Sequence, residues 1–332
     1  MIFGMLCWGS WANTFKLAGN WRYELFYFDY SIGVLLAATF AAFTFGTMGS
    51  DGFQFLDDLL QTGRRNIFYA FVGGAVFNLA NMLLLGAISV AGMAVSFPVG
   101  FGTALVVGVI WNYFMKPQGN AVLQFGGAAI VVGAVVAAAV AYSSYGAVRL
   151  ESMAKAGVLK TSSPKVGAKG IILPLASGLF MGSFLPLVDL SRTQGAGLGP
   201  YAIGFVFAAA VFFSTLVYNL FFMNLPIQGQ PVEVRDYIRR GNWKRHSLGI
   251  AGGLLWCGGA FLIFVAGGVD PNFKVSDGAT YAIGQGAGIL GALWGVVAWR
   301  EFAGADFRVK SLLYVMLALF LCGLSMVSFA SL

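Results

Sequence analysis

The sequence predicts an all-α membrane protein with ten transmembrane helices, arranged as two five-helix repeats of inverted topology. The first observation is composition: of 332 residues, 58% are hydrophobic and only 10% are charged, whereas a soluble protein carries roughly 25% charged residues. The second is a series of apolar runs of bilayer-crossing length. The third is a set of short segments that recur in the same order in both halves of the chain.

Apolar runs of about 20 residues, the length that crosses roughly 30 Å of hydrocarbon, recur along the chain. They lie near residues 1–17, 24–47, 66–89, 92–114, 121–142, 170–190, 201–224, 247–268, 279–299 and 310–331. The 46 glycines suit helices whose backbones approach closely in lipid. The chain opens directly on the first run, so we expect no cleaved signal peptide.

A polar, basic stretch divides the chain, so we expect a first repeat over residues 1–142, a linker over 143–169 and a second repeat over 170–332. Because five spans is an odd number, the second repeat must enter the membrane from the opposite side, which is typical of secondary transporters. The matching segments are Gly9-Ser10 with Gly182-Ser183, Tyr30–Gly33 with Tyr201–Gly204, Gly73–Phe77 with Gly252–Trp256, and Val99–Gly102 with Ile283–Gly286.

Basic residues are distributed unequally between the two sides of the predicted membrane domain. Fifteen of the 20 Lys and Arg residues lie in the loops after spans one, three, five, seven and nine, and five lie on the other side. The positive-inside rule then places the linker in the cytoplasm and both termini outside, in a multi-pass protein of the inner (plasma) membrane. These loops also account for the net charge of +7, so we expect no nucleic-acid partner.

Spans one and two carry the first candidate residues, because a polar solute needs hydrogen-bonding groups inside the bilayer. Trp8, Ser10 and Asn13 in span one offer an aromatic surface and polar groups for a solute. Glu24 and Asp29 at the start of span two are candidates for binding a coupling proton or sodium ion. The alternative, which we favour for these two carboxylates, is pairing with Arg22 or Lys16 at the cytoplasmic rim.

Spans three and four add amides and a hydroxyl. Asn78 and Asn81 lie three residues apart on one helical face, and amides match the polar groups of sugars or ureides. Interhelical hydrogen bonding is an equally good interpretation of this pair. Ser96 precedes Pro98, which breaks the helical ladder and either shapes a site or makes a packing kink.

The repeat pattern points to counterparts in the second half. Ser183, Trp256 and Gln285 are the predicted solute-binding residues there, with Trp294 a weaker candidate. The single histidine, His246, follows two basic residues at a helix entrance, so we expect a solvated residue there. Cys7, Cys257 and Cys322 have no metal-ligand spacing, and we expect neither a metal nor a cofactor.

Three segments carry a family resemblance: Met5-Leu6-Cys7-Trp8-Gly9-Ser10-Trp11-Ala12-Asn13, Trp21-Arg22-Tyr23-Glu24-Leu25-Phe26-Tyr27-Phe28-Asp29-Tyr30 and Phe43-Thr44-Phe45-Gly46. The chain resembles the drug/metabolite transporter superfamily, and within it the glucose/ribose-porter-type transporters and the plant ureide permeases. The resemblance implies secondary uptake of small polar solutes. Plant ureide permeases carry a phosphate-loop-like motif in a longer central loop, which Gly157–Thr161 does not complete, so we expect no nucleotide binding.

We therefore predict a permease that moves a small polar metabolite by alternating access, with a sugar as the first reading and a ureide or nucleobase as the alternative. An intramembrane enzyme would need a cluster of His, Asp or Ser at membrane depth, which one histidine at a helix end does not supply. A broad exporter of amphipathic compounds would favour an aromatic cavity with few amides, and Asn78, Asn81 and Gln285 argue against it.

Overall fold

The structure is a computed structural model that describes residues 1–48, 54–115, 117–155, 167–193, 197–267 and 277–330. The described residues form helices and no strands, and nine helical segments are long and apolar enough to cross a membrane. Eight of the ten predicted spans are each a single long helix. They are α3 (Tyr23–Phe43), α5 (Arg64–Ala91), α6 (Met93–Met115), α7 (Ala121–Lys155), α8 (Lys169–Thr193), α9 (Pro200–Asn224), α11 (Trp243–Gly267) and α14 (Phe307–Ala330).

The first predicted span, residues 1–17, is two short helices, α1 (Ile2–Ser10) and α2 (Asn13–Leu17). Neither is long enough to cross the bilayer alone, and the count of long apolar helices among the described residues is therefore nine, not ten. The Asn13 side-chain amide donates to the Ser10 carbonyl at 2.9 Å. This local bond competes with the helical ladder and marks the break.

The predicted span 279–299 is also interrupted. It consists of α12 (Asp277–Gln285), α13 (Ala287–Leu293) and a π-helical segment, η1 (Trp294–Ala298). The interruption at Gly286 places Gln285 at a helix end, and such breaks in membrane helices are tolerated where the backbone is buried in protein.

Helix α7 continues to Lys155, into the first half of the predicted linker 143–169. Ala, Arg, Leu, Glu, Met and Lys dominate residues 147–155, and these are good helix formers. Residues 156–166 of that linker lie outside the described part of the chain. Two short helices lie between long ones: α4 (Phe55–Gln61) follows α3, and α10 (Val234–Arg239) follows α9.

Helices of the first half (residues 1–142) pack mainly against helices of the second half (170–332). Helix α5 packs on α8, and α11 packs on α1; α3 packs on α11, and α9 packs on α5. Helix α6 contacts α8, and α13 contacts α1. In the predicted repeat, the counterparts are α1 and α8, α3 and α9, α5 and α11, and α6 and α13. Exchanging each helix for its counterpart turns every pairing above into another pairing of the same set, as a two-fold relation between the halves requires.

Glycines allow the closest of these approaches. A Cβ on Gly253 of α11 would lie 2.1 Å from the Tyr30 carbonyl oxygen of α3, and one on Gly74 of α5 would lie 2.5 Å from the Phe207 carbonyl oxygen of α9. Gly253 and Gly74 are counterparts in the predicted repeat, so equivalent helix pairs use an equivalent glycine contact.

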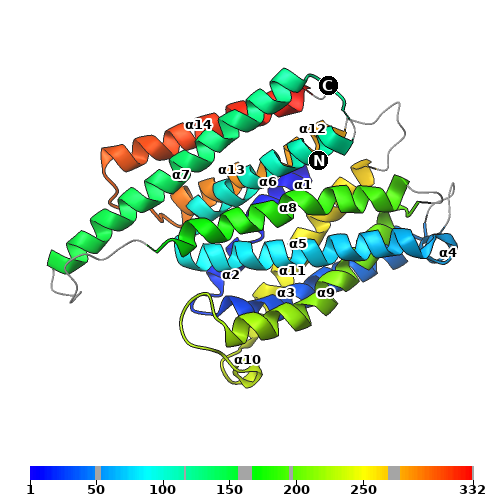
Figure 1. The fold of residues 1–332 in the computed structure, drawn as a ribbon. Coiled ribbons are helices and arrows are strands. Elements are labelled where there is room, and N and C mark those ends of the chain that lie inside the picture. The colour runs from blue at the N-terminus through cyan, green and yellow to red at the C-terminus, as the bar shows by residue number, and fades with distance from the viewer. Residues whose placement is uncertain (49–53, 116, 156–166, 194–196, 268–276, 331–332) are drawn as a thin grey trace.

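Figure 1 shows α7 and α14 side by side along one edge of the bundle. Helix α10 and the carboxyl end of α7 lie at one end, whereas α4 and both chain termini lie toward the other. We call the end that holds α10 and residues 143–155 the linker end, and the opposite one the terminal end.

Candidate functional site

A small cavity lies in the middle of the bundle, between the two halves. It receives side chains from α1, α5, α6, α8, α11 and α12, and from the turn after α1. Its volume of about 10 Å³ corresponds to roughly one water molecule. The lining residues are Trp8, Trp11, Phe77, Asn81, Phe101, Met181, Phe184, Trp256 and Gln285. Four of the predicted binding residues therefore meet here: Trp8, Asn81, Trp256 and Gln285.

Stacked aromatic rings form most of the cavity wall. Trp8 of α1 and Trp256 of α11 are nearly parallel, with ring centroids 5.9 Å apart and an angle of 7° between their planes. Phe77 of α5 stacks on Trp256 with centroids 4.2 Å apart. The rings come from both halves and close the space between them, so the cavity is occluded in this conformation.

Three polar atoms of the lining are buried without a partner in the described residues: Trp8 Nε1, Asn81 Oδ1 and Gln285 Oε1. Asn81 uses its other atom, Nδ2, to donate to the Tyr27 hydroxyl at 3.1 Å. An unpaired buried polar group costs about 1–3 kcal/mol. The residues that line this cavity thus hold one donor and two acceptors without partners, which suits the binding of a polar molecule.

Asn78 does not reach this cavity, although it lies three residues from Asn81. Its Nδ2 is within hydrogen-bonding distance of Ser214 Oγ at 2.8 Å, Thr215 Oγ1 at 3.0 Å and the Val211 carbonyl at 3.1 Å, all on α9. Asn78 therefore ties α5 to α9, the interhelical role considered for it from the sequence.

Two of the predicted serines, Ser96 and Ser183, also lie away from the cavity lining. Ser96 is buried in α6, and its hydroxyl has no partner among the described residues. Ser183 donates to the Leu179 carbonyl of its own helix at 2.9 Å.

Ser10 and Asn13 instead help to close the linker end. Ser10 accepts a hydrogen bond from Trp294 Nε1 at 3.0 Å, and Asn13 Oδ1 accepts one from Trp299 Nε1 at 2.7 Å. Trp294 and Trp299 belong to the second half of the chain. These bonds therefore tie the first helices to the second half.

Glu301 adds an ionic link at the same end. Its carboxylate pairs with Lys16 Nζ at 2.7 Å and accepts the backbone N–H groups of Met93 and Ala94 at 3.0 and 2.8 Å. The carboxylate thus caps the start of α6, where unpaired N–H groups favour a negative charge.

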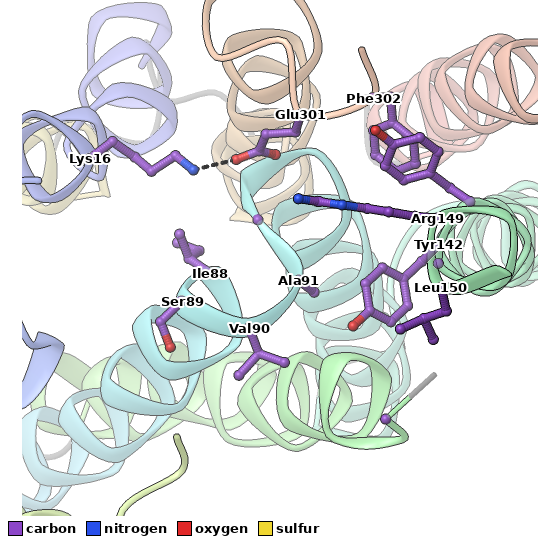
Figure 2. A pocket seen from close by; sticks show the side chains of 14 residues that line it. Lys16, Ile88, Ser89, Val90, Ala91, Tyr142, Arg149, Leu150, Glu301 and Phe302 are labelled. Atoms are coloured by element: carbon purple, nitrogen blue, oxygen red, sulfur yellow. Dashed lines mark ion pairs between the residues drawn. The ribbon is translucent and has the colours of Figure 1, made fainter. Parts of the chain in front are cut away.

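A larger cavity of about 560 Å³ opens beside Glu301. Figure 2 shows Arg149 extending from α7 across this cavity, while Lys16 pairs with Glu301 on the other side. Its wall also includes the carboxyl end of α5, Tyr142 and Phe302. Its size lies within the range of small-molecule sites, about 300–1,000 Å³.

The two carboxylates considered for ion coupling have different partners. Glu24 pairs with Arg22 at 2.6 Å, as predicted for the rim. Asp29 pairs instead with His246, whose Nδ1 lies 2.9 Å from its Oδ2, and it accepts a hydrogen bond from the Tyr237 hydroxyl. The expectation that His246 is a solvated end residue is wrong, because its side chain is only 25% exposed and contacts a buried carboxylate.

No sequence pattern points to the aspartate–histidine–tyrosine contact, since Asp29 is 208 residues from Tyr237 and 217 residues from His246. Tyr237 lies in α10, outside the membrane-spanning segments. Burial and the hydrogen bond to Asp29 raise the pKa of its phenol well above the ordinary value, so it remains a donor at neutral pH. Among the described residues, no group of three or more His, Cys, Asp or Glu side chains is arranged to hold a metal.

The family model and the curated relatives agree on one kind of protein, the ureide permeases. Residues 26–173 match the family model described as ureide permease. Ureide permease 2 of Arabidopsis thaliana is 24% identical to this chain, and the match covers 100% of this chain and 96% of that protein. Ureide permease 1 of the same plant is 22% identical with the same coverage. A solved crystal structure, 16% identical, covers 99% of this chain and 95% of its own, with a TM-score of 0.53, and so has a related fold.

Proposed function

We propose that this chain, which is similar over its whole length to plant ureide permeases, is a secondary transporter for a small polar metabolite of the ureide or nucleobase class. The observation that carries the proposal is the central cavity, where polar atoms from both halves are buried without partners. Sites between repeats, near the middle of the membrane, are typical of secondary transporters.

The chemistry of the cavity suits a planar amide. Asn81 Oδ1 and Gln285 Oε1 accept hydrogen bonds, and Trp8 Nε1 donates one. A nucleobase or a cyclic ureide supplies N–H donors and a carbonyl acceptor on one ring. The ring would lie against the indole of Trp256 after Trp8 withdraws and the cavity widens beyond its present volume of about 10 Å³. Sugar hydroxyls can also make these bonds, but the comparisons support the ureide alternative and give no support to sugar transport, to a glucose/ribose-porter relationship or to the drug/metabolite superfamily.

Transport requires the occluded cavity to open to each side in turn. The links at the linker end, Lys16 with Glu301, Ser10 with Trp294 and Asn13 with Trp299, each join the first half to the second. Separating the halves breaks these links and withdraws Trp8 from Trp256, which opens a path toward the linker end. Equivalent helices of the two halves make equivalent contacts, which supports a rocking of one half against the other as the movement that opens the cavity.

Counterflow in proteoliposomes tests this function with a panel of labelled allantoin, uracil, xanthine and sugars. We expect exchange of a ureide or nucleobase by the unaltered protein. Asn81→Leu or Gln285→Leu leaves one substrate N–H unpaired, at about 1–3 kcal/mol, or roughly 5- to 150-fold in apparent affinity.

Asn224→Leu is the matched control, because Asn224 is an exposed amide on α9 that donates only to the Leu220 carbonyl of its own helix. We expect the control to keep the affinity of the unaltered protein. Exchange of sugars alone, or equal affinity in Asn81→Leu, Gln285→Leu and the control, would contradict the proposed substrate class and site.

A further inference from the structure

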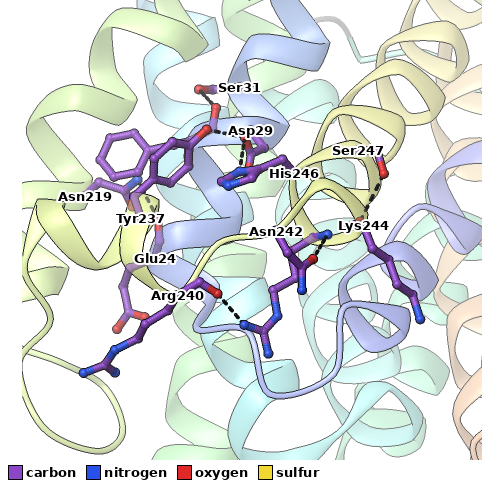
Figure 3. A network of polar contacts seen from close by, with 12 residues as sticks. Glu24, Asp29, Ser31, Asn219, Tyr237, Arg240, Asn242, Lys244, His246 and Ser247 are labelled. Carbon is purple, nitrogen blue, oxygen red and sulfur yellow. Dashed lines mark hydrogen bonds and ion pairs between the residues drawn. The ribbon is translucent and has the colours of Figure 1, made fainter.

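A cluster of three titratable side chains, Asp29, Tyr237 and His246, lies at the linker end, away from the central cavity. Asp29 of α3 has a side chain only 2% exposed, and its Oδ1 and Oδ2 lie 3.1 and 2.9 Å from His246 Nδ1 of α11. Tyr237 of α10 donates its hydroxyl hydrogen bond to Oδ1 of the same carboxylate. Figure 3 shows the histidine and the tyrosine converging on Asp29 from different helices.

The charged groups around the cluster have other partners or point away from Asp29. On α3, Glu24 pairs with Arg22. On α10, Asp236 pairs with Arg240 at 3.1 Å. At the entrance to α11, Arg245 donates to the Arg240 carbonyl and lies over the Trp21 ring. Lys244, also at this entrance, extends away from Asp29 in Figure 3. The titratable group in direct ionic contact with Asp29 is therefore His246.

The cluster joins the two halves of the chain. Asp29 belongs to the first half, whereas Tyr237 and His246 belong to the second. At the terminal end, the repeat counterpart of α10 makes a related contact: Asp58 of α4 accepts the N–H of Gly199, at the start of α9, at 2.7 Å. Each short helix thus contacts the beginning of a long helix from the other half: α10 contacts α3, and α4 contacts α9. Of these two contacts, the one at the linker end includes a histidine.

We infer that Asp29, His246 and Tyr237 form a proton-binding latch, which holds the two halves together at the linker end while His246 carries a proton. The inference rests on the proposed transport function, because opening of the linker end is a step of that transport. The ligand of this site is a proton taken from the aqueous phase at the linker end, which His246 reaches through its exposed edge.

The direction of the effect follows from the charges. An imidazolium facing a carboxylate makes a charge-assisted hydrogen bond, roughly twice as strong as a neutral one. Loss of the proton leaves a neutral imidazole beside a buried carboxylate, and the ionic part of the link is lost. The latch is therefore closed at lower pH and loosens as the pH rises.

Trp21 supplies a reporter that does not depend on transport. Its indole ring lies 5.8 Å from the His246 ring in an edge-on contact and 6.5 Å from Tyr237. An imidazolium quenches indole emission more strongly than a neutral imidazole. The emission of Trp21, measured between about pH 5 and 8 and obtained by subtracting the spectrum of Trp21→Phe, is therefore expected to rise with pH as the cluster loses its proton.

The decisive comparison uses His246→Gln and Asp29→Asn beside Asp306→Asn. We expect both cluster variants to lose the pH transition of Trp21 emission, and Asp306→Asn to keep it. Asp306 lies at the same end, where its side chain accepts the Val309 N–H, and asparagine preserves that cap. Tyr237→Phe, which keeps the ring and its packing, is expected to shift the transition and covers the case in which Asp29→Asn does not fold.

Counterflow at a series of pH values gives the second readout. We expect the exchange rate of the unaltered protein to rise with pH over the same range, and the pH dependence to be lost in His246→Gln. A Trp21 emission that does not change with pH, or one that changes equally in His246→Gln, would overturn the latch. Absence of exchange at every pH, with the emission transition intact, would instead count against the proposed transport function.

Discussion

At the scale of single residues, Asn78 and Asn81 show how far a helical pattern can be read. Spacing of three residues predicts that both amides lie on one face of α5, and the helix confirms that they do. Positions three apart still differ by about 60° around the axis, and this difference directs Asn78 to α9 and Asn81 to the cavity. The sequence could not choose between these fates, because they depend on which helix lies beside each residue.

Asn78→Leu is expected to lower stability rather than solute affinity. The substitution removes the amide that joins α5 to three groups on α9, at a cost of about 1–3 kcal/mol in the free energy of unfolding. Thermal unfolding in detergent, followed together with counterflow affinity, checks this. A variant with unchanged melting temperature and weakened affinity would place Asn78 in the binding site.

At the scale of helices, periodicity and length predicted the eight unbroken spans well, since hydrocarbon thickness fixes the length of each apolar run. The interruptions within the other two spans were not predicted, because the breaks at Trp11-Ala12 and Gly286 leave the hydropathy of these spans unchanged. Both interruptions lie next to residues of the central cavity, Trp11 and Gln285. At both interruptions the backbone keeps right-handed helical dihedral angles, with ψ of −36° at Trp11, −12° at Ala12 and −17° at Gly286. Each interruption is therefore a local change of hydrogen bonding within a span, which an apolar pattern does not reveal.

Gly74→Ala is expected to destabilise the contact between α5 and α9. The new methyl group would lie 2.5 Å from the Phe207 carbonyl oxygen, so one helix must move, at about 1–3 kcal/mol. Gly258→Ala is the matched control, since a Cβ at Gly258 of α11 meets nothing within 4 Å. Comparison of their melting temperatures checks the contact; an equal effect of the two substitutions would contradict it.

At the scale of the whole molecule, the weak internal matches predicted two inverted repeats, and the helix pairings are compatible with that prediction. The packing of one half against the other was not predicted. The sequence also did not predict the shape of the occluded cavity, because the stacking of Trp8 on Trp256 is set by tertiary packing. The distribution of charge likewise predicts which end faces the cytoplasm. That orientation stays a prediction and is open to a direct test.

Cysteine labelling of intact cells tests the orientation. In a background without the native cysteines, Gln230→Cys lies at the linker end and Gln118→Cys between α6 and α7 at the terminal end, and both positions are exposed. Because fifteen basic residues favour a cytoplasmic linker end, a membrane-impermeant maleimide should label Gln118→Cys in intact cells and Gln230→Cys only after lysis. The reverse pattern would invert the topology.

The stacked rings of Trp8, Trp256 and Phe77 also bear on the membrane potential, because they block a path for protons through the protein. A continuous file of water through the protein would carry protons and discharge the membrane, but the space between these rings holds about one water molecule. Apolar constrictions of this kind stop ions because they do not stay wet. The rings proposed to contact the solute therefore also block ions, so the membrane keeps its voltage while no solute is carried.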